Sequence, residues 1–198
     1  MAESRADAGD VPADEYAFHF LSGRPSLDLV ATIGERWRRA FERLREPRDL
    51  ARWAVEAGLV EEAPRVLRRD LERARRLRAA IARVVFAWVD GRTLPARDVA
   101  VVNEAAARPG LVEALAVTGE PVVPVRASIG AVLSTVARDA IGLVTSGDPR
   151  RVRECGADDC SLLFWDASRP GRRRWCSMEG CGNRAKTSRY RQRHAVAR

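Results

Sequence analysis

The stretches CGADDC at 155–160 and CSMEGC at 176–181 decide how the last quarter of the chain folds. Such cysteine pairs form knuckles that converge on one ion, and structural zinc is commonly held by four thiolates in a tetrahedron. The connector at 161–175, SLLFWDASRPGRRRW, predicts two short strands around a Pro-Gly turn. Residues 183–194 lack proline and glycine, which favours a helix. We predict a four-cysteine zinc finger of zinc-ribbon or treble-clef type, with zinc on Cys155, Cys160, Cys176 and Cys181.

Other uses of four cysteines are disulfides, a redox pair and an iron–sulfur cluster. Disulfides need an oxidising compartment, and residues 1–15 lack the basic and apolar regions of a signal peptide. A redox pair usually shows a C-x-x-C motif, which this sequence lacks. An iron–sulfur cluster also takes four thiolates. We predict zinc, and a cytoplasmic protein whose thiols stay reduced.

Two stretches carry a resemblance to known families. CGNR at 181–184, preceded by RWCSM at 174–178 and followed by Lys186 and Arg189, resembles the CGNR zinc finger family. GRPSLDLV at 23–30 resembles the start of the ABATE domain that accompanies this finger. The resemblance implies a bacterial, stress-induced transcription regulator. One departure is Ala31, where the family pattern has asparagine.

Positive charge is concentrated in the predicted finger. The chain has 198 residues and a net charge of +8, with 46% hydrophobic and 31% charged residues, a composition typical of globular proteins. Residues 150–198 contain 13 Arg or Lys and 5 Asp or Glu, whereas residues 1–149 contain 22 of each kind. Four thiolates around one zinc ion contribute −2, which leaves about +6 on this segment. No uninterrupted apolar run approaches the roughly 18 residues of a membrane span, so we expect no membrane partner.

The remaining chain predicts a mainly α fold with a minor β-hairpin. We expect a disordered tail at 1–15, a helical domain at 16–149 and the finger at 150–198. Apolar spacing and the Pro and Gly positions predict five helices. The first has Leu27, Val30, Ile33 and Trp37 on one face, and the others cover 47–58, 64–91, 95–107 and 128–145. A hairpin is predicted at 111–126 around Gly119, and residues 146–149 form a linker to the finger.

Three features of the helical domain have competing interpretations. The arginines between residues 68 and 78 alternate with acids, which favours a solvated helix face over a nucleic-acid contact. His19 lies beside aromatic residues, which favours a structural role. The tryptophans Trp37, Trp53 and Trp88 are expected to fill the core. The alternative is that they line a cavity for an apolar or amphipathic effector.

The finger offers basic side chains suited to phosphate. Its turn supplies Arg169, Arg172, Arg173 and Arg174, and its helix supplies Lys186, Arg189, Arg191 and Arg193. We expect Asn183, Arg184, Trp165 and Trp175 to support the fold of the finger, Arg184 through Asp158, Asp159 or the first knuckle. Neither of the two histidines has a Ser or Cys neighbour typical of a nucleophile pair, so we predict that the protein is not an enzyme.

The functional prediction is a DNA-binding transcription regulator. In it, the finger binds duplex DNA and the helical domain senses a small molecule or a partner. The alternative is an RNA- or protein-interaction adaptor in which the zinc is structural. A salt-dependent preference for duplex DNA over RNA would separate the two.

Overall fold

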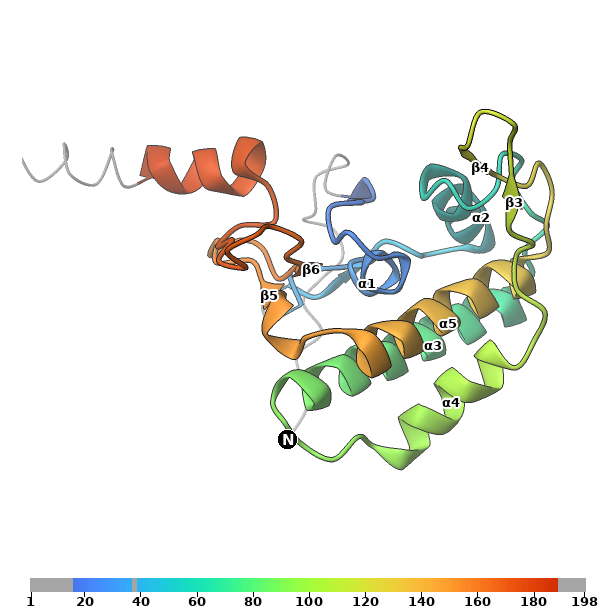
Figure 1. Ribbon diagram of the computed structural model, residues 1–198, viewed down its shortest axis with the longest axis horizontal. Helices are drawn as coiled ribbons and strands as arrows, with labels where there is room; N and C mark the ends of the chain where they lie inside the picture. The colour runs from blue at the N-terminus through green and yellow to red at the C-terminus, as the bar shows by residue number, and fades with distance from the viewer. Residues whose placement is uncertain (1–15, 37–38, 189–198) are drawn as a thin grey trace, which may run out of the picture.

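The computed structural model describes residues 16–36 and 39–188. The main elements of this part are five α-helices and three two-stranded antiparallel sheets. The predicted mainly α fold with minor hairpins and a four-cysteine finger is confirmed. The predicted tail at 1–15 lies outside the described residues. Figure 1 shows α3 and α5 side by side, with α4 on one side and α1 and α2 on the other.

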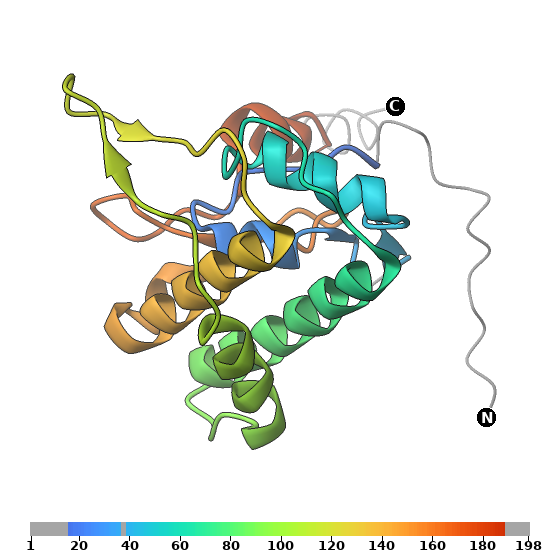
Figure 2. The same cartoon turned by 90° about the vertical axis from the view of Figure 1, so that its right-hand side faces the viewer.

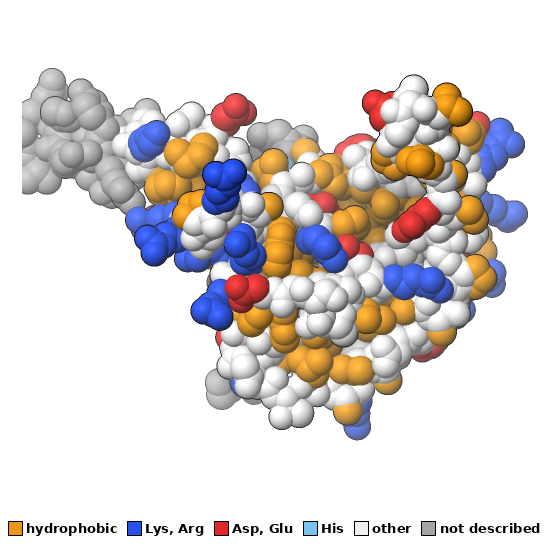
Figure 3. Space-filling model, in the orientation of Figure 1, with side chains coloured by type: hydrophobic (Ala, Val, Ile, Leu, Met, Phe, Trp, Pro, Cys, Tyr) orange, Lys and Arg blue, Asp and Glu red, His pale blue; other side chains and the backbone are white. Residues whose placement is uncertain are grey.

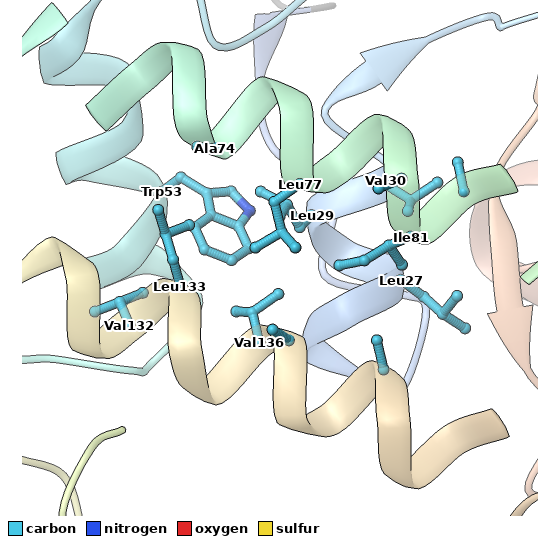
Figure 4. Close-up of a cluster of buried hydrophobic side chains, with 14 of the residues drawn as sticks. Leu27, Leu29, Val30, Trp53, Ala74, Leu77, Ile81, Val132, Leu133 and Val136 are labelled. Atoms are coloured by element: carbon cyan, nitrogen blue, oxygen red, sulfur yellow. The ribbon is translucent and has the colours of Figure 1, made fainter. Parts of the chain in front are cut away.

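The core lies between α3 (Arg68–Val89) and α5 (Ile129–Ser146) and is closed by α1 (Pro25–Val30) and α2 (Pro47–Glu56). Leu77 and Ile81 of α3 face Val132 and Val136 of α5, and Trp53 of α2 fills the space at one end (Figure 4). Burying one such aliphatic side chain contributes about 1.5 to 3 kcal/mol. Trp53 is fully buried, so it fills the core, as the sequence favoured. Trp37 lies outside the described residues.

Local signals set the ends of three helices. Pro47 opens α2, and the Asp49 carboxylate accepts hydrogen bonds from the backbone N–H groups of Arg45 and Glu46, both at 2.9 Å. The Ser128 hydroxyl caps α5 by accepting from the N–H of Ala131 at 3.1 Å. The helix predicted from Pro64 begins only at Arg68. Asp70 accepts from the N–H of Leu67, which places the helix cap at that residue.

The first helix is shorter than predicted. It ends at Val30, and Ile33 lies in a strand, so the predicted face from Leu27 to Trp37 is wrong. Strand β1 (Ile33–Gly34) pairs with β2 (Phe41–Glu42), and the Phe41 ring lies against Gly34 where any Cβ would collide with it. This aromatic contact requires glycine at that position. It favours a hairpin over the continued helix that the apolar spacing suggested.

Arg78 anchors the β1–β2 hairpin to α3. Its buried guanidinium donates to both Glu42 carboxylate oxygens, at 2.7 and 2.6 Å, and to the Thr32 hydroxyl at 2.8 Å. Arg75 donates to the carbonyl oxygen of Leu44 at 2.6 Å. The prediction that all arginines at 68–78 are solvated is therefore wrong for Arg78, which is buried, and incomplete for Arg75. The sequence could not show this pairing, because Glu42 lies 36 residues away.

The chain between α3 and α5 contains α4 and a projecting hairpin. Helix α4 (Ala96–Ala106) is fixed by Arg83, which donates two hydrogen bonds to Asp98 at 2.8 and 2.6 Å. Strands β3 (Ala114–Leu115) and β4 (Pro121–Val122) pair antiparallel where the hairpin was predicted. Figure 2 shows this hairpin extending away from the helices.

Helix α5 is long and apolar enough, by length and composition, to cross a membrane. It packs against α1, α3 and α4. It also contains Arg138, which donates to the carbonyl oxygen of Ala106 at 3.0 Å, and Asp139, which pairs with Arg24 at 2.9 Å. These contacts are those of a central core helix.

Candidate metal centre and basic surface

The finger begins with a β-hairpin that encloses the first knuckle. After the short helix η3 (Pro149–Arg151), β5 (Val152–Glu154) pairs with β6 (Leu163–Trp165), so that Cys155 and Cys160 lie in the loop between the strands. The predicted hairpin around Pro170 and Gly171 is therefore wrong. Of the connector, only 163–165 is a strand, and its partner lies before the first cysteine.

The second knuckle leads into a helix, as predicted. The Ser177 hydroxyl accepts from the N–H of Gly180 at 3.2 Å and caps a π-helical turn, η4 (Met178–Gly182). Residues 183–188 continue as α-helix. The part of the predicted helix at 189–194 lies outside the described residues.

The four cysteine sulfurs form one compact cluster and all lie within 4.8 Å of one another. A tetrahedron with Zn–S bonds of about 2.3 Å has sulfurs about 3.8 Å apart. Two pairs agree with this spacing, since Cys160 and Cys176 are 4.0 Å apart and Cys176 and Cys181 are 3.6 Å apart. Hydrogen bonds to Cys155 raise the pKa of the Cys160 and Cys176 thiols. A bound cation would offset that cost by stabilising all four thiolates, so the donor set fits Zn²⁺.

Arg184 contacts both the second knuckle and the first. Its guanidinium donates to the Cys181 sulfur at 3.2 Å and pairs with the Asp159 carboxylate at 3.2 Å. Desolvation lowers the pKa of Arg184, but the negative groups at Cys181 and Asp159 outweigh it, and the net effect is a raised pKa. The contact with Asp159 that the sequence suggested is present. Its contribution to stability remains a prediction.

The hydrophobic support of the cluster differs from the expected pair of tryptophans. Trp175 packs against the cysteines, whereas Trp165 packs against the core of the helical domain. The central apolar residue of the finger is Phe164, which is fully buried and which the sequence analysis did not select. The continuous apolar run LLFW at 162–165 could have indicated a buried strand. The Asn183 side chain is exposed, and the backbone carbonyl oxygen of Asn183 accepts a hydrogen bond from the Thr187 hydroxyl at 3.0 Å.

Basic side chains of the finger fall into two groups. Arg151, Arg153 and Arg173 donate to carbonyl oxygens of residues 166, 168, 171 and 176, and so hold the loop at 166–176. Arg169, Arg172 and Lys186 are exposed and have no ion pair or hydrogen bond among the described residues. Arg174 is exposed beside Trp175. Arg189, Arg191 and Arg193 lie outside the described residues.

The exposed group gathers at one end of the molecule. Gly171, with a φ of 58°, closes a turn through its N–H bond to the carbonyl oxygen of Ser168 at 3.1 Å. This left-handed conformation favours glycine, and the turn places Arg169 and Arg172 at the protein surface. Figure 3 shows Lys and Arg side chains gathered over this region.

Comparison with protein families agrees with this geometry. A family model described as "Putative stress-induced transcription regulator", the ABATE domain, matches residues 23–147. A second model, described as CGNR zinc finger, matches residues 151–194. The chain belongs to the ABATE family and carries a CGNR zinc finger. A comparison with curated proteins finds no match.

In this ABATE protein the stretch GRPSLDLV joins three parts of the fold. The carbonyl oxygen of Ser22, just before it, accepts from the N–H of Trp165 in the finger at 2.8 Å. The N–H of Ser26 donates to Asp139 of α5 at 3.0 Å. Ala31, at the position of the departure from the family pattern, packs against the cysteine cluster. The helical domain and the CGNR finger are therefore in direct contact.

A cleft of about 510 Å³ lies beside this contact. Its lining comes from both domains and includes His19, Phe41 and Arg43 on one side and Cys160 and Arg184 on the other. Burial, followed by the positive charges of Arg43 and Arg184, lowers the pKa of His19. The cleft is within the range of small-molecule sites, whose volumes are about 300 to 1,000 Å³.

Proposed function

We propose that this protein is a transcription regulator that binds duplex DNA through its CGNR finger. The observation that carries the proposal is the exposed group Arg169, Arg172, Arg174 and Lys186, held on one metal-supported unit. Phosphate binding needs positive side chains at fixed positions, and side chains without protein partners can turn to a phosphate at little cost.

The second group of arginines supports the proposal in a different way. Arg173 donates to the carbonyl oxygen of Cys176 at 2.6 Å and lies over the Phe164 ring at 5.0 Å. We therefore assign Arg173 to the structure of the finger and place phosphate contacts at Arg169 and Arg172. Arg150 extends the basic surface, since 91% of its side chain is exposed.

Salt dependence of DNA binding tests this proposal. Each phosphate contact contributes about −0.9 to the slope of log K against log salt concentration. We expect Arg169→Ala and Arg172→Ala each to make the slope shallower by about 0.9, for every duplex sequence alike. Arg68→Ala, at an exposed position of α3, is the matched control and should leave the slope unchanged.

Two outcomes would overturn the assignment. Equal slopes for the wild type and both turn variants would show that these arginines do not contact phosphate. A preference for RNA, or no salt-dependent binding of nucleic acid, would favour the adaptor function over a DNA-binding regulator.

For the sensing role we propose the cleft between the two domains, because residues of both domains line it, whereas Trp53 is fully buried in the core. A ligand in this cleft would contact both the helical domain and the finger. The fluorescent amphipathic anion anilinonaphthalene sulfonate is a suitable probe. Filling the cleft with Ala31→Phe should reduce its binding, and unchanged binding would contradict this location.

A further inference from the structure

A small pocket lies where the starts of α3 and α5 meet the end of α4. Figure 1 shows these three helix ends on the same side of the molecule. The pocket has a volume of about 80 Å³, and apolar side chains from all three helices line it. They are Leu77, Val101, Ala105, Ile129 and Leu133. Because one molecule of liquid water occupies about 30 Å³, the pocket has room for about three groups of the size of water or methylene.

Charged side chains make up the rest of the lining, apart from Gly130. They are Asp70, Arg73, Arg76, Glu104 and Arg108, so the three arginines exceed the two acids by one positive charge. Between 46% and 60% of each arginine side chain is exposed, whereas Leu77, Ile129 and Leu133 are buried. The pocket is therefore apolar inside and positively charged at its opening. This combination suits a small ligand that has one apolar end and one anionic end.

Arg76 and Arg108 have hydrogen-bond donors left to use. Both pair with Glu104, but the nitrogen–oxygen distances are 4.0 and 3.9 Å, which are too long for hydrogen bonds. Neither guanidinium makes a hydrogen bond within residues 16–36 and 39–188. A guanidinium binds a carboxylate through two parallel hydrogen bonds. The carboxylate of a ligand could therefore make the hydrogen bonds that Glu104 does not make.

Glu104 is easier to displace than the other acid of the pocket. Asp70 accepts a hydrogen bond from the N–H of Leu67 at 3.0 Å and pairs with Arg73 at 3.4 Å, so it is held at the start of α3. The Glu104 side chain is 61% exposed and meets both of its arginines at long range. Exposed ion pairs of this kind contribute little to stability. A ligand can therefore replace Glu104 beside Arg76 and Arg108 at little cost.

We propose that this pocket binds a short-chain carboxylate. Its carboxylate group lies between Arg76 and Arg108, and its chain of about three further carbon atoms lies on Leu77, Ile129 and Leu133. A longer chain would extend beyond the pocket. The site shares no lining residue with the cleft between the domains, and it does not depend on DNA binding by the finger. Because the ligand would contact three helices at once, its binding should stabilise the helical domain.

Titration of the full zinc-loaded chain with sodium butyrate, followed by amide NMR at constant ionic strength, tests the proposal. We expect saturable shifts at Gly130 and Leu133, with a dissociation constant of about 1 mM, as for a small and weakly held ligand. Butanol, which has an equally long chain and no charge, should bind about tenfold more weakly or worse. The absence of saturable shifts, equal binding of butanol, or shifts confined to the cleft between the domains would each overturn the proposal.

Two arginine variants test where the carboxylate lies. Arg76→Gln and Arg108→Gln should each weaken butyrate binding about tenfold, because each removes a charged hydrogen-bond donor. Arg69→Gln, at an exposed position of α3 outside the pocket, is the matched control and should bind butyrate like the wild type. Equal binding by all three variants would show that Arg76 and Arg108 do not hold the ligand.

Glu104→Gln should change the affinity in the opposite direction. It removes the carboxylate that competes for Arg76 and Arg108, so it should tighten butyrate binding about twofold to fivefold. A substitution that only disturbed the pocket would weaken binding instead. Unchanged or weaker binding by Glu104→Gln would therefore refute the placement of the ligand between these two arginines.

Discussion

Replacing Asp28 by asparagine is expected to make the helical domain more stable at neutral pH. Asp28 lies in α1, where its carboxylate accepts a hydrogen bond from the N–H of Ser22 at 3.1 Å. Burial is the main cause of its raised pKa, which is about 6 compared with an ordinary value of 3.8, and the nearby Asp139 carboxylate adds to the effect. Asparagine has nearly the same shape, keeps an acceptor oxygen for Ser22 and carries no charge.

The magnitude follows from the two pKa values. The difference between 3.8 and about 6 corresponds to about 3 kcal/mol at 1.36 kcal/mol per pH unit. Because the folded-state pKa is the higher one, the stabilising contribution of this group is fully present below pH 3.8 and is lost as the pH rises through about 6. We therefore expect Asp28→Asn to be about 2 to 3 kcal/mol more stable than the wild type at about pH 8. This advantage should narrow by about 1.4 kcal/mol at about pH 5.

Urea unfolding followed by helix ellipticity, in zinc-containing buffer, measures this difference at each pH. The metal site is the same in both proteins, so its pH dependence cancels when the unfolding free energy of the wild type is subtracted from that of the variant. Asp98→Asn is the matched control with opposite sign, because hydrogen bonds from Arg83 lower the pKa of Asp98. The Asp98→Asn protein should be less stable than the wild type at high pH, and this difference in stability should become smaller as the pH falls. An Asp28→Asn protein that is less stable at high pH, or whose advantage is the same at every pH, would refute the reasoning.

Two further predictions concern the finger. Arg184→Ala should destabilise the finger by about 1 kcal/mol through loss of its contacts with Asp159 and Cys181, seen as faster zinc release to a chromogenic chelator, while the salt slope of DNA binding stays unchanged. Lys186→Ala is the control for this variant. Unchanged zinc release together with a shallower salt slope in Arg184→Ala would instead assign Arg184 to phosphate binding. Metal analysis should find one zinc per chain, and Cys181→Ser should lower the zinc content; a full load in that variant would exclude it as a ligand.

Local patterns predicted the long helices and the metal cluster. Leu71, Leu77 and Ile81 recur at helical spacing and are buried along α3, because one face of that helix lies on the core. The x4 spacing of both cysteine pairs likewise fixes two knuckles. These features depend on residues near one another in the sequence, so sequence reading could find them.

Features set by distant contacts were missed. Ile33 continues the helical spacing of α1, but the contact of Phe41 with Gly34 bends the chain into a hairpin. The partner of β6 lies before the first cysteine, in a strand only three residues long, too short for periodicity to reveal. Arg173 is exposed like its neighbours Arg172 and Arg174, and only the fold shows that its guanidinium donates to the carbonyl oxygen of Cys176.

The contact between finger and helical domain changes what zinc removal should do. If the finger folded independently of the helical domain, chelation would unfold 150–198 and leave the helices intact. In the structure, however, Val152 and Leu163 of the finger are buried in the same core as α1, α3 and α5. Zinc sites contribute about 10 to 16 kcal/mol to the folding of small fingers. Part of that free energy therefore supports the helical domain, whose stability should also fall when the metal is lost.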